Sequence, residues 1–82
     1  MRYRLDETRH VGALRIAALV EQDVTPSRFA SAAFITGRKR PVALLFARGE
    51  VCWAMTPEGA ALEKSTVETL MPGAWERFRR NG

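Results

Sequence analysis

Two apolar segments near the middle of the chain, separated by a short polar break, restrict its fold more than any other feature. Residues 41–47 read Pro-Val-Ala-Leu-Leu-Phe-Ala and residues 51–55 read Val-Cys-Trp-Ala-Met, with Arg-Gly-Glu between them. Short apolar runs joined by a break of this length are typical of a β-hairpin. We expect strands at about residues 42–47 and 51–56, with a turn at Arg48 and Gly49.

This turn would set Phe46 opposite Val51 and Leu44 opposite Trp53. The large side chains of the hairpin then share one face, and smaller side chains occupy the other. We expect the large-residue face to form most of the core, so that Phe46→Ala lowers the free energy of unfolding by about 3–5 kcal/mol.

A short helix is the alternative for residues 41–49. Proline is well tolerated in the first turn of a helix, and Gly49 is a good terminator just past its end. Arginine is also a poor first residue for the tight turns that hairpins prefer. However, such a helix has only about eight residues, which is short for one that reads a DNA groove. Local sequence favours the hairpin and leaves both structures open.

Helices are expected on both sides of the hairpin. In a helix over residues 6–21, apolar side chains would cover most of the surface, so we expect a helix there. Thr25 followed by proline predicts the start of a second helix, which would end near Gly37. A helix from Thr56 to Lys64 and a final short helix carrying Trp75 and Phe78 should follow the hairpin. The sequence therefore predicts one small α+β domain over residues 1–82, with two N-terminal helices, a β-hairpin and C-terminal helices.

Composition excludes several classes of function. The chain has one cysteine, Cys52, and one histidine, His10, so it forms no internal disulfide and lacks the ligands of a zinc site. No nucleophile has a base partner recognisable by spacing, and we expect neither an enzyme nor a cofactor or metal. No segment approaches the ~18 apolar residues of a membrane helix, and the N-terminus lacks a signal-peptide pattern. We therefore expect a cytoplasmic protein without a membrane partner.

The positive charge of the chain is concentrated in its first half. The formal net charge is +4; residues 1–41 contain eight Arg or Lys and four Asp or Glu, whereas residues 42–82 contain five of each. The run Arg38-Lys39-Arg40 lies at the end of the basic half. A local basic excess is typical of an anion-binding surface, with nucleic acid as the first candidate. The alternative is a solvated loop that keeps the neighbouring apolar runs soluble.

The order of several short motifs resembles the winged helix-turn-helix DNA-binding superfamily over residues 10–63. The motifs are Leu14-Arg-Ile-Ala-Ala-Leu-Val, Val24-Thr-Pro-Ser-Arg-Phe-Ala, Leu44-Leu-Phe-Ala-Arg-Gly-Glu-Val and Ala54-Met-Thr-Pro-Glu-Gly-Ala-Ala-Leu-Glu. In that superfamily a threonine-capped second helix follows the first closely, and the wing closes with a Leu-Thr-x-x-Gly phrase. The resemblance implies a small bacterial or phage DNA-binding protein, either a transcription regulator or an accessory factor of winged-helix type.

Duplex DNA is the partner that the charge and the resemblance together indicate. The residues expected to contact it, through phosphates or at a helix start, are Thr25, Ser27, Arg28, Arg38, Lys39 and Arg40. For Thr25 the alternative is helix capping alone. Because residues 41–47 carry no polar side chain, base readout should be weak. Replacing one phosphate-binding residue of the basic run should reduce the slope of log affinity against log salt by about 0.9.

A non-enzymatic protein-binding module is the alternative function, for example a phage or mobile-element inhibitor of a host protein. Both faces of the hairpin in residues 42–55 are apolar, which is more than one sheet face of an 82-residue core needs. The surplus could form a homodimer interface or bind a protein partner. Alternatively, helices could cover the hairpin on both sides and leave no surplus.

Overall fold

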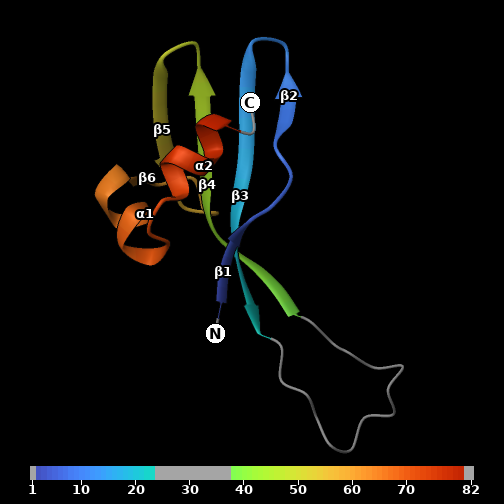
Figure 1. Ribbon diagram of the computed structural model, residues 1–82, viewed down its shortest axis with the longest axis vertical. Helices are drawn as coiled ribbons and strands as arrows, with labels where there is room; N and C mark the ends of the chain where they lie inside the picture. Colours follow the sequence, from blue (N-terminus) through green and yellow to red (C-terminus); the bar gives the residue numbers. More distant parts are fainter. Residues whose placement is uncertain (1, 24–37, 81–82) are drawn as a thin grey trace, which may run out of the picture.

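Six strands and two short helices make up the part of the chain that the structure describes. The structure is a computed structural model that describes residues 2–23 and 38–80 (Figure 1). The strands are β1 (Arg2–Leu5), β2 (Arg9–Val11), β3 (Leu14–Asp23), β4 (Arg38–Arg48), β5 (Val51–Met55) and β6 (Ala61–Leu62). The helices are α1 (Lys64–Leu70) and α2 (Ala74–Arg80), and both follow the last strand.

These strands form one antiparallel sheet in the order β1-β3-β4-β5-β6, with β2 also paired to β3. β3 and β4 are the longest strands, and they pair along their whole lengths apart from one bulge between Leu19 and Val20. Figure 1 shows β3 and β4 side by side through the middle of the sheet, with the short strands β1 and β2 along the outer side of β3.

Two glycines allow the tight turns at one end of the sheet. Gly12 and Gly49 each have a φ of 61°, in the left-handed region that favours glycine. Each is the first residue of a two-residue loop, because the flanking residues pair with each other across β2–β3 and β4–β5. No described residue other than glycine has a positive φ. This matches type II′ turns, which require a positive φ only at the first loop position.

The core lies between the two helices and one face of the sheet, which we call the covered face. Alternate side chains of β3, β4 and β5 point into it, in keeping with the two-residue repeat of a strand. They are small or medium-sized and at most 7% exposed: Ala17, Leu19, Ala43, Leu45, Ala47, Cys52 and Ala54. Val67 of α1 and two residues of α2, Ala74 and Phe78, complete the core from the other side.

Helix α2 attaches to the core through two aromatic side chains, as the sequence predicts. Phe78 is fully buried, and the guanidinium carbon of Arg15 on β3 lies 5.7 Å from the centre of its ring. The ring of Trp75 lies 6.1 Å from that of Phe78. The Nε1–H of Trp75 donates a hydrogen bond to the carbonyl of Lys64 at 3.0 Å, which ties α2 to the start of α1.

The predicted fold class is wrong, because the first expected N-terminal helix is not formed. Residues 6–21 contain β2, a tight turn and most of β3, so residues 14–20, a helix in the winged helix-turn-helix resemblance, belong to a strand. Apolar side chains lie on both faces of β3, and such a run cannot be told from a buried helix by periodicity alone. The second expected helix, residues 25–37, lies outside the described residues. The described part is instead an antiparallel sheet followed by two short helices.

A hairpin joins β4 and β5, but its turn lies one residue later than predicted. The loop residues are Gly49 and Glu50, and Phe46 therefore pairs with Trp53 instead of Val51. Glycine at the first loop position removes the objection that arginine is poorly suited to this turn. The alternative short helix is not formed, because β4 continues up to this loop.

The predicted core face of the hairpin is also wrong. Leu44, Phe46 and Trp53 are only partly buried and Val51 is 65% exposed, whereas the smaller side chains face the helices. The physical reason is helix packing, because alanines on β4 and β5 let the helices approach closely and the bulky Phe78 fills the remaining space. Phe46→Ala should therefore cost less than the value expected for a core residue.

The helix predicted from Thr56 to Lys64 is wrong as well. Thr56 begins a tight loop in which its Oγ1 accepts a hydrogen bond from the N–H of Ala60 at 3.0 Å. Its carbonyl oxygen accepts a second one from the N–H of Gly59 at 2.9 Å. β6 follows, and α1 begins only at Lys64. Threonine followed by proline fits a turn as well as a helix cap, so the pattern does not separate the two.

Two adjacent leucines on β4 test the assignment of the faces. Leu45 is fully buried in the core, whereas Leu44 lies on the other face and is partly exposed. We expect Leu45→Ala to lower the free energy of unfolding by about 3 kcal/mol and Leu44→Ala by about 1 kcal/mol, because only the first leaves a closed cavity. Urea denaturation of both variants measures the difference, and equal losses would contradict the assignment.

Candidate functional site

The face of the sheet opposite the helices is the candidate site, and we call it the open face. Both helices pack on the covered face, so they do not shield it. Its apolar side chains come from four strands and are Val11, Leu14, Ile16, Ala18, Leu44, Phe46, Val51, Trp53 and Met55. Val11 and Val51 are 63% and 65% exposed, and the others are partly exposed. A continuous apolar surface on a small domain indicates a binding surface.

Cross-strand pairing arranges the open face in rows. Ile16, Phe46 and Trp53 lie opposite one another across β3, β4 and β5. The ring centres of Phe46 and Trp53 are 5.6 Å apart and their planes differ by 7°, so the two rings are stacked. The neighbouring row consists of Ala18, Leu44 and Met55. Aromatic side chains therefore lie at the centre of the face.

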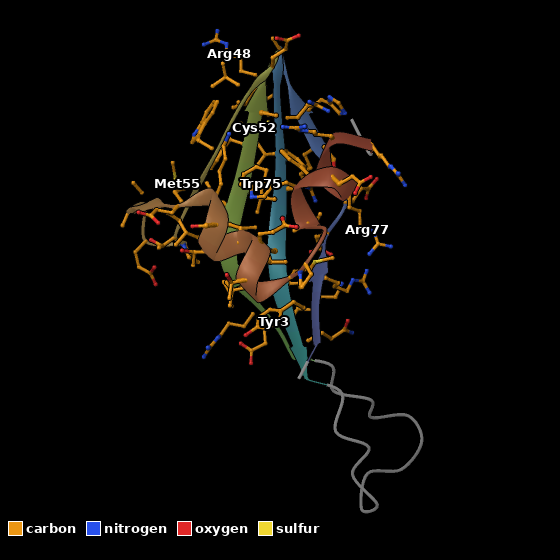
Figure 2. All side chains as sticks on the ribbon, turned by 60° about the vertical axis from the view of Figure 1, so that its left-hand side comes forward. Tyr3, Arg48, Cys52, Met55, Trp75 and Arg77 are labelled. Carbon is orange, nitrogen blue, oxygen red and sulfur yellow. The ribbon has the colours of Figure 1, made fainter. Side chains whose placement is uncertain are left out.

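A hollow lies at one end of the open face, next to the two tight turns. Its volume is about 430 Å³, and it is lined by Val11, Gly12, Ala13, Leu14, Arg48 and Trp53. The lining is apolar apart from Arg48, which Figure 2 shows near the tip of the β4–β5 hairpin. A Cβ atom added to Gly12 would have no atom within 4 Å, so the β2–β3 turn is not packed against other parts of the chain at this residue.

The register of the sheet determines where this hollow lies. Leu14 pairs with Val11 on β2 and with Arg48 on β4, and Arg48 in turn pairs with Val51 on β5. One line of residues therefore crosses four strands at the end where both tight turns lie. A different loop length in either turn would break this line and move Arg48 away from the apolar lining. The glycines of the two turns therefore help to set the position of the hollow.

Basic residues surround the apolar rows. Four exposed residues occupy open-face positions of their strands: Arg4, Arg9, Lys39 and Arg48. Asp6 lies beside two of them, with its Oδ1 4.0 Å from Arg4 Nη2 and 3.7 Å from Lys39 Nζ. Within residues 2–23 and 38–80, no carboxylate oxygen lies within 4.0 Å of a side-chain nitrogen of Arg9 or Arg48. These strand positions therefore carry a net positive charge.

The structure separates the basic run that the sequence singles out. Residues 38–40 begin β4 instead of forming a loop, so consecutive side chains point to opposite faces. Lys39 lies on the open face, whereas Arg40 lies on the side of the helices, with its Nη2 3.6 Å from Glu21 Oε2. Arg38 is the first residue of β4. The other predicted DNA contacts, Thr25, Ser27 and Arg28, lie outside the described residues.

The sequence does not single out Arg4, Arg9 or Arg48. Each lies apart from the basic run, and only strand pairing brings the three to the same face. One weak signal exists, because Arg9 and Val11 share a face once residues 9–11 are taken as a strand. The pairing partners themselves cannot be read from local sequence.

The open face carries groups that can bind a ligand through apolar contact, ring stacking and ion pairing. It offers apolar area, two stacked rings and several cations, whereas Cys52 is buried on the covered face. Among the described residues, no group of His, Cys, Asp and Glu side chains could hold a metal ion. Within the same part of the chain, every helix is too short or too polar to cross a membrane.

Comparisons with known proteins do not identify a family for this chain. No protein-family model, no curated protein and no solved structure matches it. Its function therefore has to be inferred from the geometry and chemistry of the open face.

A double-mutant cycle tests whether the stacked rings form one unit. We expect Phe46→Ala and Trp53→Ala to be coupled by about 0.5–1.5 kcal/mol in the free energy of unfolding, because each ring loses its stacking partner. Urea denaturation of the two single variants and the double variant measures this energy. A cycle between Phe46 and Trp75 is the control, since Trp75 lies on α2, and there additivity should hold. The absence of coupling between Phe46 and Trp53 would contradict the stacked arrangement.

Proposed function

We propose that this protein is a non-enzymatic protein-binding module whose open face docks on a partner protein. The observation that carries the proposal is the apolar surface that extends over β3, β4 and β5 on the side away from the helices. The helices already complete a core on the covered face, so this surface is not needed to close it. Two exposed valines beside seven partly exposed apolar side chains are typical of a surface that a partner covers.

The arrangement of residues supports a protein interface. Aromatic side chains are enriched at the centre of such interfaces and contribute much of their binding energy, and here Phe46 and Trp53 are central. Met55 adds a flexible apolar side chain of the kind that adapts to different partners. Completing the burial of these partly exposed side chains contributes about 25 cal/mol for each Å² of apolar surface removed from water.

Duplex DNA fits this face less well. Duplex binding depends mainly on cations that follow the phosphates along one surface. The open-face cations instead surround apolar rows, and Lys39 and Arg40 of the basic run point to opposite sides of the sheet. Proteins that stack bases present free ring faces, whereas one face of Phe46 and one face of Trp53 are already occupied by their mutual stacking. Nucleic acid is therefore the competing outcome of the test below.

Selection from a random peptide library displayed on phage tests the proposal. We expect the protein to enrich peptides, and Trp53→Gln to weaken the binding of their synthetic copies at least ~10-fold, because central aromatic residues dominate interface energies. Trp75→Gln is the matched control: it replaces the other tryptophan, on the helical layer, and should leave the affinity unchanged. Fluorescence anisotropy of labelled peptides measures binding, and thermal denaturation confirms that both variants are folded.

Two results would overturn the proposal. Equal peptide affinities of folded Trp53→Gln and Trp75→Gln would show that the open face is not the docking surface. Failure to enrich any peptide, together with tight binding of a random-sequence DNA duplex at low salt, would assign the protein to nucleic acid instead.

A further inference from the structure

The hollow next to the two turns specifies the chemistry of the partner. We infer that the partner presents an acidic, apolar segment: a large apolar side chain enters this hollow, and a neighbouring carboxylate pairs with Arg48. The inference rests on the proposed function and adds the class of partner to it. The shape of the hollow, the charge beside it and the charge of the whole open face all support it.

The hollow has room for a large apolar side chain together with a neighbouring group of the partner. It has a volume of about 430 Å³, and Val11, Leu14 and Trp53 supply apolar groups to its lining. Gly12 and Ala13 have little or no side chain, so the β2–β3 turn does not close the space. An apolar side chain that enters here would release water from all of these groups, and such pockets are where interface anchors concentrate their binding energy.

The charge beside the hollow selects a carboxylate. Arg48 is the one charged residue among those described as lining it, and no described carboxylate oxygen lies within 4.0 Å of its side-chain nitrogens. A guanidinium group can hold a carboxylate through two parallel hydrogen bonds, which favours acidic over merely polar partners. Arg9 provides a second such cation on β2, opposite Ile16.

A second copy of this chain is disfavoured by the same charges. In a two-fold dimer each open face meets an identical one, so the exposed cations of one copy approach those of the other. Like charges brought together across an interface oppose association and select against that partner. Asp6 is the carboxylate seen beside these cations, and it already lies near Arg4 and Lys39. An acidic segment of another protein therefore complements this face better than a second copy does.

Charge reversal at Arg48 tests the inference with the whole 82-residue chain. A random peptide library selected on the wild-type protein should enrich peptides that combine Trp, Phe, Leu or Met with Asp or Glu. The same library selected on Arg48→Glu should enrich Lys or Arg in place of the acidic residues. Synthetic copies of the acidic peptides should bind Arg48→Glu at least ~10-fold more weakly than wild type, because an ion pair becomes a repulsion. Arg79→Glu makes the same charge change on α2 and should bind like wild type.

The outcomes separate this inference from the proposed function. Enrichment of apolar peptides without acidic residues would contradict the inference that the partner is acidic, and so would equal losses of affinity in Arg48→Glu and Arg79→Glu. Neither result would contradict the proposal that the open face is a docking surface. A dimer mass in light scattering that Trp53→Gln converts to a monomer mass would assign the face to a second copy and overturn the inference. Failure of every peptide, combined with binding of a DNA duplex, would overturn the proposed function itself.

Discussion

The close packing of two short helices on an alanine-rich sheet face is the interaction on which the rest of the structure depends. Phe78 is fully buried there, and a bulkier side chain in place of Ala47 would force the helical layer away from the strands. Because small side chains occupy the covered face, strand alternation directs the large residues of the hairpin, such as Phe46 and Trp53, to the opposite face. The apolar open face is thus a direct consequence of how the core is packed.

Some of this structure could be predicted from local sequence patterns, whereas other parts depend on contacts between residues distant in sequence. The hairpin region and the attachment of Phe78 follow from short apolar runs and from a pair of aromatic residues on a short C-terminal helix. The helix expected over residues 6–21 is wrong because a strand with apolar side chains on both faces, such as β3, has no clear period of two. The choice of core face in the hairpin depends on Phe78, distant in sequence, and strand propensity alone does not reveal which face a helix will cover.

The candidate site was harder to predict than the fold, because its charges come from separate strands. A run such as residues 38–40 is conspicuous in sequence, yet in a strand its side chains divide between two faces. Arg4, Arg9 and Arg48 become neighbours of one apolar surface only through pairing with β3. Linear clustering of charge is therefore a poor guide to a binding face in a sheet, where pairing decides which charges act together.

The distribution of charge over the open face has a further consequence for how a partner would be oriented. Asp6 lies beside Arg4 and Lys39 at the end away from the turns, so the charge there is partly neutralised. At the other end, Arg48 has no described carboxylate within ion-pair distance. The two ends of the face therefore differ in which cations already have a described carboxylate within 4.0 Å. An acidic segment would approach with its carboxylates toward Arg48 at the turns. Contacts between its apolar side chains and the apolar rows would then set its position along the face. The same cations oppose face-to-face association of identical chains, because like charges would meet across that interface.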